Sequence, residues 1–299
     1  MLKNTRQRSV ALYLVLVVVF SLPWWALMLS TGSIELARGF VIHMQMWAPA
    51  LAALLASWLL QRSARGIGWM WGRSRYVAAG YLIPVAYSLL AYAPLWLSGL
   101  APSTFGVFAT KSAAGLAMTS LSPMWPAALQ IFLTMSFGVV QSAASAAGEE
   151  IGWRGYLVPA LRERFSFATT AWISGIVWAC WHMPVVLFAD YHGGAPEWYS
   201  IVCFTIMIIA SGAIAAWLRL RSGSVWPCIV LHAVHNAVVQ WLLDPMTATG
   251  GHAAWFAGEF GAALAVTTVL FALVICRRPL GDARDGETAI ADRTQTETA

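Results

Sequence analysis

The sequence predicts an all-α, polytopic membrane protein with about eight transmembrane helices, and composition is the first indication. Of its 299 residues, 59% are hydrophobic and only 10% are charged. A soluble domain of ordinary composition is about a quarter charged. The 17 Trp and 8 Tyr residues suit the aromatic belts that form at membrane interfaces. Most of the protein surface is therefore expected to face lipid.

Apolar length is the second indication. A helix that rises 1.5 Å per residue needs about 20 apolar residues to cross a hydrocarbon core of about 30 Å. The first apolar run follows a basic start, as in a signal peptide, but its length and the lack of an A-x-A-like cleavage site favour an uncleaved span. The predicted spans are 9–29, 40–60, 76–98, a run that begins near 127, 167–189, 199–218, 225–243 and 254–276.

The distribution of Lys and Arg is the third indication. With eight spans and a cytoplasmic N-terminus, sixteen of the 18 Lys and Arg residues fall in cytoplasmic segments. Only Arg38 and Lys111 fall outside. Because cytoplasmic loops carry the excess of positive charge, we expect both termini in the cytoplasm.

The chain is expected to form a single transmembrane domain over residues 1–276, with its motifs in a core of about 127–243. Residues 277–299 are polar and predict a disordered cytoplasmic tail. No basic stripe with interleaved aromatic residues accompanies the net charge of +5, so no nucleic-acid partner is expected. The four cysteines lie in apolar runs and are expected to be free, buried thiols.

Three segments place polar groups where lipid would make them costly. The first is the run from Gly148 to Gly155. On a helix, Glu150 and Arg154 are i,i+4 neighbours that can pair, whereas Glu149 points about 100° away. Glu149 would then be left to act as a base. A wet cytoplasmic loop is the alternative interpretation of both glutamates.

The second segment places His182 fifteen residues into the fifth span. Trp178 lies one turn earlier on the same face, and Pro184 removes a backbone donor close to the imidazole. The alternative here is a histidine that serves only in packing.

The third segment lies in the seventh span, where His232 and Asn236 are i,i+4 and share a face, with His235 offset from them. Polar contacts between helices are the alternative. If the fourth helix continues through 150–164, Glu149 lies about 22 Å from Arg164, and His232 and Asn236 lie about 16 and 22 Å from Arg221. Glu149, His182, His232 and Asn236 can then share one layer of the membrane.

Together these motifs resemble the CAAX prenyl endopeptidase and bacteriocin-processing family of intramembrane proteases, also called the Abi family. Its pattern is E-E-x-x-x-R, then F-x-x-x-H, then H-x-x-x-N. Here the pattern reads 149–154, 178–182 and 232–236, with Trp178 in place of the phenylalanine. The resemblance covers roughly residues 127–243, and the eight-helix count also agrees with it.

The resemblance implies an endopeptidase in which Glu149 and His182 activate a water and His232 and Asn236 stabilise the oxyanion. Such an arrangement is chemically sound. Supporting roles are implied for Glu150, Arg154, Trp178 and His235. Two mechanisms stay open: a metalloprotease with zinc or another divalent metal held by Glu149, His182 and His232, and a metal-free, glutamate-dependent hydrolase.

The sequence also bears on other intramembrane proteases and on non-catalytic membrane proteins. H-E-x-x-H, G-x-S-G and an intramembrane G-x-G-D are all missing, which disfavours three other intramembrane protease chemistries. A non-catalytic membrane protein, such as a proton-coupled transporter or an immunity or scaffold protein, is the alternative. Glu259 belongs to no motif and is interpreted as an interfacial charge. The expected partners are a peptide or protein substrate, membrane-anchored or soluble, and the lipid bilayer of a prokaryotic cell.

Overall fold

The computed structural model describes residues 8–33 and 39–280, and its elements there are helices. One isolated bridge, between Ser103 and Thr247, is the exception. Seven helices are long and apolar enough to cross a membrane, and a shorter apolar helix follows them. The predicted polytopic, all-helical fold is confirmed. Arg38 and most of the predicted tail, residues 281–299, lie outside the described residues.

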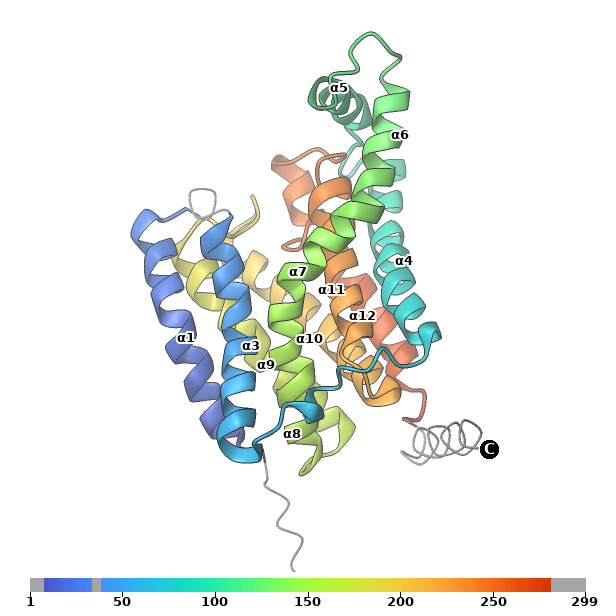
Figure 1. Cartoon of the computed structure of the whole chain (residues 1–299). Helices are drawn as coiled ribbons and strands as arrows, with labels where there is room; N and C mark the ends of the chain where they lie inside the picture. Colours follow the sequence, from blue (N-terminus) through green and yellow to red (C-terminus); the bar gives the residue numbers. More distant parts are fainter. Residues whose placement is uncertain (1–7, 34–38, 281–299) are drawn as a thin grey trace, which may run out of the picture.

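Apart from α5, which no predicted span covers, and α12, which begins later than predicted, the helices lie within a few residues of the predicted spans. They are α1 (Val10–Thr31), α3 (Phe40–Gln61), α4 (Ser74–Ser98), α5 (Phe105–Gly115), α6 (Met124–Leu133), α7 (Val139–Glu150), α8 (Val158–Arg162), α9 (Phe167–Phe188), α10 (Glu197–Ser222), α11 (Trp226–Val238) and α12 (Ala262–Cys276). Three π-helical segments, η2 (Thr134–Gly138), η3 (Ile151–Leu157) and η4 (Val239–Leu243), extend or join some of them. In Figure 1, α7 lies between α3 and α11, and it packs against both.

The fourth span is a continuous helix from Met124 to Arg162, as the depth comparison assumed. Within it, α7 passes very close to α3. A Cβ atom added to Gly148 would lie 2.5 Å from the carbonyl oxygen of Met46, and one added to Gly152 would lie 2.7 Å from that of Pro49. Small residues of this kind allow two membrane helices to approach closely. The approach carries the paired glutamates into the protein interior.

The last span differs from its predicted range, 254–276. Residues Gly251–Trp255 form a short 3-10 turn, and the helix α12 begins only at Ala262. Gly258 has a φ of +78°, a left-handed conformation that glycine adopts without steric cost and that ends regular helix. The intervening segment folds back over the other helices, and it carries Glu259 inward.

The two ends of the helix bundle differ in charge. Among the described residues, every Lys and Arg except Lys111 and the buried Arg154 lies at the end where α3, α8, α10 and α12 finish (Figure 1). We call this the arginine-rich end. The opposite end holds α5, the connection 189–196 and the segment 244–261. The positive-inside pattern found in the sequence is therefore a property of the folded molecule.

The cysteines are all free, but they are not all buried. Cys203 and Cys228 are buried, Cys276 is half-buried and Cys180 is exposed. The expectation of free thiols is confirmed, and that of burial is wrong for Cys180, which faces outward from α9.

The close contact between α7 and α3 predicts the effect of a single methyl group. Gly152→Ala forces a Cβ into the backbone of α3 and should destabilise the protein by about 1–3 kcal/mol. Gly106→Ala is the control, because Gly106 is also helical and nothing lies within 4 Å of its Cβ position. Thermal unfolding in detergent should show a lower midpoint for the first variant only. Equal midpoints would contradict the close packing of these helices.

Candidate active site

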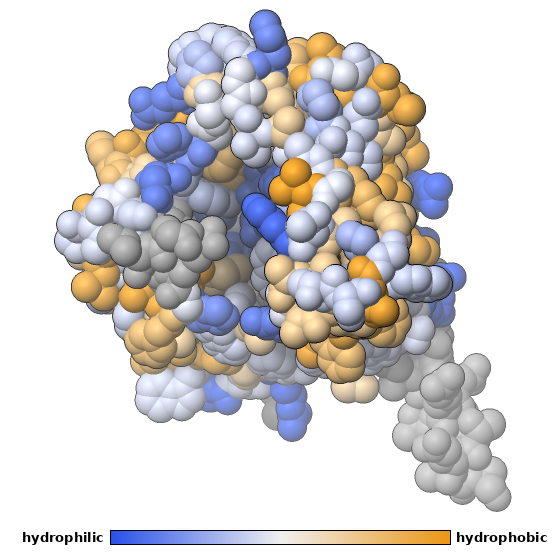
Figure 2. Space-filling view, turned by 90° about the horizontal axis from the view of Figure 1, so that it is seen from above, coloured by the Kyte–Doolittle hydropathy of each residue, from blue (hydrophilic) through white to orange (hydrophobic). Residues whose placement is uncertain are grey.

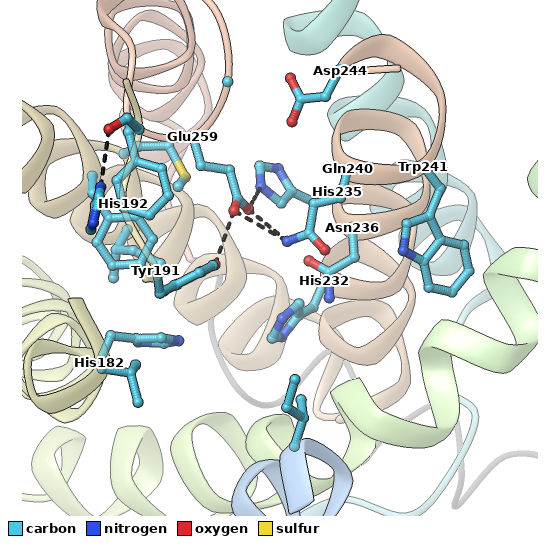
Figure 3. A pocket seen from close by; sticks show the side chains of 18 of the residues that line it. His182, Tyr191, His192, His232, His235, Asn236, Gln240, Trp241, Asp244 and Glu259 are labelled. Atoms are coloured by element: carbon cyan, nitrogen blue, oxygen red, sulfur yellow. Dashed lines mark hydrogen bonds and ion pairs between the residues drawn. The ribbon is translucent and has the colours of Figure 1, made fainter. Parts of the chain in front are cut away.

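The residues predicted from the three motifs line one cavity. It has a volume of about 980 Å³, and Glu149, His182, His232 and Asn236 all contribute to its wall. These side chains come from α7, α9 and α11. Figure 2 looks onto the end opposite the arginine-rich end and shows the hollow, with hydrophilic side chains inside it. In Figure 3 the rings of His182 and His232 point from opposite sides into the same space. The structure thus brings the predicted residues together.

Glu149 is held by tryptophan side chains. Its Oε2 accepts hydrogen bonds from Nε1 of Trp178 at 2.6 Å and Nε1 of Trp153 at 3.4 Å. The residue is only 2% exposed, yet it lines the cavity. Its Oε1 has no hydrogen-bond donor among the described residues. One carboxylate oxygen therefore fixes the group, and the other is available to a water or a substrate.

Glu150 forms a buried three-residue cluster on the far side of the same helix turn. Its Oε1 accepts from Nη1 of Arg154 at 2.7 Å and from Nδ1 of His232 at 3.0 Å. The guanidinium also lies 4.1 Å from the ring centroid of Trp178, in a cation–π contact. The predicted pairing of Glu150 with Arg154 is present. The contact of Glu150 with His232 links the first motif to the third.

The histidine tautomers follow from these partners. Nδ1 of His182 lies 2.9 Å from the carbonyl oxygen of Trp178, and a carbonyl can only accept, so Nδ1 carries the hydrogen. In the neutral ring, Nε2 is then an acceptor. The aromatic rings of Trp181 and Phe204 pack edge-on against the imidazole, with centroids at 4.9 and 5.4 Å. The His182 ring is thereby held with its basic nitrogen free.

Asn236 and His235 point in different directions, as their spacing on the helix predicts. Asn236 is half-buried in the cavity wall, and its amide has no hydrogen-bond partner among the described residues. His235 turns away from Glu150. Its Nδ1 lies 2.7 Å from the hydroxyl of Tyr87, and its Nε2 lies 2.9 Å from Oε1 of Glu259.

Glu259 is not an interfacial charge, and that interpretation is wrong. The residue is 7% exposed and accepts hydrogen bonds from His235, Gln240 and Tyr191 at 2.9–3.1 Å (Figure 3). Burial favours the protonated carboxyl, but these donors outweigh burial and lower the pKa of Glu259. The fold-back of the segment before α12 brings it inside. The sequence held one signal, since His235 and Gln240 are further polar groups on a helix that is otherwise largely apolar.

Asp244 is a second carboxyl in the cavity wall that the motifs did not indicate. It accepts a hydrogen bond from the hydroxyl of Tyr92, which in turn accepts one from the backbone N–H of Gly258 at 3.1 Å. Burial raises the pKa of Asp244 from 3.8 to about 7. Asp244 itself is half-buried, and its position directly after the seventh span gave no reason to expect a hydrogen bond with Tyr92.

A metal site was one of two open mechanisms. Among the described residues, no group of three or more His, Cys, Asp and Glu side chains lies close enough together to hold a metal ion. The donor types of Glu149, His182 and His232 would suit zinc. In this arrangement, however, Oε2 of Glu149 is occupied by indole donors, and the three side chains do not converge on one point. The arrangement therefore does not fit a metal.

The Glu150 cluster predicts that two Glu→Gln substitutions will differ greatly in how much they destabilise the protein. Glu150→Gln leaves the guanidinium of Arg154 buried without its counter-charge, which should cost about 3–5 kcal/mol. Glu163→Gln removes the partner of Arg8 in a more exposed pair, whose side chains are 16% and 40% exposed, and should cost about 0–1 kcal/mol. Unfolding in detergent distinguishes them. Similar losses in both variants would contradict a structural role for the cluster.

Asp244 predicts a pH-dependent difference in stability. Because its folded-state pKa of about 7 lies above its unfolded value, the folded protein keeps a proton that the unfolded chain releases. This contribution to stability is complete below about pH 4 and is lost as the pH rises through about 7. Asp244→Asn keeps the side chain neutral. The excess of its melting temperature over that of the wild type should be smaller at pH 5 than at pH 8, and a constant difference would contradict the raised pKa.

The part of the chain that carries the motifs is similar to known proteins. Residues 130–238 match the family described as type II CAAX prenyl endopeptidase Rce1-like. The chain is also 30% identical over 97 residues to a protein of Methanococcus maripaludis named CAAX prenyl protease 2. That match covers 31% of this chain and 35% of the relative, so the chain spans about a third of the length of the relative. Residues 130–238 are therefore similar to the Rce1-like type II CAAX prenyl endopeptidases, in the region where the motif resemblance lies.

Proposed function

We propose that the protein is an intramembrane endopeptidase in which Glu149 and His182 activate a water molecule. The observation that carries this proposal is the convergence of Glu149, His182, His232 and Asn236 on one cavity. Polar groups recruited from three membrane helices to one pocket are what a hydrolytic site needs. The match of residues 130–238 to the type II CAAX prenyl endopeptidase family also supports the proposal.

The first step is attack on the substrate. A water between Oε1 of Glu149 and Nε2 of His182 gives a proton to one of these acceptors while its oxygen bonds to the carbonyl carbon of the peptide. The carbonyl π bond breaks, and its electron pair becomes an oxyanion. The transferred proton then passes to the leaving nitrogen as the C–N bond breaks, which releases an amine and a carboxylic acid.

The oxyanion is stabilised from α11. The Nδ2–H group of Asn236 is a donor without a protein acceptor among the described residues, so it is available to the substrate. His232 gives Nδ1–H to Glu150, and it can donate from Nε2 only as an imidazolium. Glu150 then supplies the counter-charge, and Arg154 holds that carboxylate in place. Preorganised donors of this kind favour the tetrahedral intermediate.

No step of this reaction is assigned to a metal, because Glu149, His182 and His232 are not arranged as one ligand set. The chain's own residues provide the base, the donors and a cavity within the helix bundle. The metallopeptidase alternative makes a distinct prediction, which is inhibition by chelators.

We also propose that both termini are cytoplasmic, in the cell membrane of a prokaryote. The support is the segregation of Arg and Lys at one end of the folded molecule, which cytoplasmic loops are expected to show.

Substitution of the four cavity residues tests the activity. Cleavage of a mixed set of quenched fluorescent decapeptides by the purified protein in detergent should fall about 100-fold or more in Glu149→Gln, His182→Ala and His232→Ala. It should fall about 10- to 100-fold in Asn236→Ala. The assay in detergent also distinguishes hydrolysis from transport, because a detergent micelle does not separate two compartments and holds no ion gradient. Full activity in the three charged or imidazole variants would end the peptidase proposal.

Chelation decides between the two mechanisms. If the reaction depends on Glu149 and not on a metal, cleavage should be unchanged after dialysis against a chelator. Loss of activity that is restored by added zinc would instead favour the metallopeptidase.

The indole of Trp178 should orient Glu149. Trp178→Phe keeps an aromatic ring beneath Arg154 but removes the donor to Oε2, and a hydrogen bond to a charged group contributes about 1.5–3 kcal/mol. We expect kcat to fall about tenfold with KM little changed. Trp217→Phe is the control, because it removes an indole donor that bonds the carbonyl oxygen of Arg278 and does not line the cavity. Equal kcat values for the two variants would contradict this role.

A further inference from the structure

The cavity opens at the end of the bundle opposite the arginine-rich end. Nine of its lining residues are exposed: Gly39, His43, Gln141, Asp190, His192, Gly194, Trp241, Thr249 and Gly250. All but Gln141, which lies in α7, stand where α3 begins, after α9, or in or after η4, and these three places lie at that opposite end (Figure 1). Figure 2, which looks onto this end, shows the hollow directly.

The protein is closed on the arginine-rich side of the site. Below Glu149 the helix continues as η3, in which Trp153, Tyr156 and Leu157 are fully buried. Arg219 seals this region further, since its guanidinium donates to the carbonyl oxygens of Arg154 and Gly66 at 3.1 and 3.0 Å. Among the described residues, this packing closes the arginine-rich side, so the cavity reaches Glu149 from the opposite half of the bundle.

We infer that the site is reached from the extracytoplasmic side, and that its substrate is a peptide segment exposed on that side of the membrane. This inference rests on the proposed peptidase function and on the charge asymmetry of the bundle. An exported peptide or the extracytoplasmic segment of a membrane protein has the required location. A protein confined to the cytoplasm does not.

The depth of the site adds a requirement for an extended segment. His232 lies about 16 Å below the end of η4 at Leu243, given a rise of 1.5 Å per residue. An extended chain covers about 3.3 Å per residue, so about five residues must enter before a peptide bond reaches the imidazole. A folded surface cannot enter in this way. The cleaved bond therefore lies in an unfolded tail, linker or loop.

Cysteine labelling tests the location of the cavity mouth without any need for activity. Thr249→Cys places a thiol at the mouth, and Ser74→Cys places one at the arginine-rich end, where both native side chains are exposed. Cys180→Ser and Cys276→Ser remove the more accessible native thiols. A membrane-impermeant maleimide added to intact cells should label position 249 and not position 74. After permeabilisation it should label both.

The opposite pattern, with labelling of position 74 alone in intact cells, would overturn the inference even if the protein is an active peptidase. Labelling of both positions in intact cells would overturn it as well, since the bundle would then have no fixed orientation.

Sided cleavage tests the substrate. Membrane-impermeant quenched decapeptides should be cleaved by right-side-out vesicles and not by sealed inverted vesicles, and Glu149→Gln should abolish the signal. Cleavage by inverted vesicles alone would overturn the inference. If the wild type in detergent cleaves no peptide while position 249 is labelled from outside, the peptidase proposal fails and the location of the mouth stands.

Discussion

The site depends on a carboxylate buried between an arginine and a histidine. Glu150 is 1% exposed and Arg154 is fully buried, and such a pair is tolerated in a membrane interior only when its hydrogen bonds are well made. His232 completes the cluster from α11. The contact fixes α11 relative to α7 and sets the tautomer of the imidazole. It also releases Glu149 from pairing with the arginine, so the neighbouring carboxylate can act as a base.

Tryptophan connects this cluster to the rest of the site. The ring of Trp178 lies under the guanidinium of Arg154, its indole N–H binds Glu149, and its backbone carbonyl accepts from His182. One residue of α9 therefore contacts Arg154, Glu149 and His182. The family pattern has phenylalanine here, which supplies the ring and the carbonyl but not the indole donor. Trp178 thus adds a hydrogen bond to Glu149 that a phenylalanine cannot make.

Much of this arrangement follows from local spacing, which a sequence displays directly. The i,i+4 relation predicts the contact of Glu150 with Arg154 and the separation of His232 from His235, because both depend on a single helix. Apolar length and charge segregation predict the spans for the same reason. The membrane depth of Glu149 could be compared with that of His232 only by assuming a continuous fourth helix, which the structure contains.

Contacts between distant segments were not predictable in this way. Glu259 was interpreted as exposed because an apolar run without proline conceals the fold-back before Ala262. The hydrogen bond of Asp244 is made by Tyr92, which is 152 positions away. Likewise, the hydrogen bond of Trp178 to Glu149 spans 29 positions, and the direction in which the cavity opens depends on how the helices pack. No local pattern contains this information.

The shortness of α12 has a consequence for the surrounding lipid. Its 15 residues span about 22 Å, against a hydrocarbon core of about 30 Å. A helix shorter than the bilayer is accommodated by local thinning of the bilayer around it. Phospholipid headgroups and water should therefore dip toward the protein beside α12. Such a depression shortens the apolar path beside this helix.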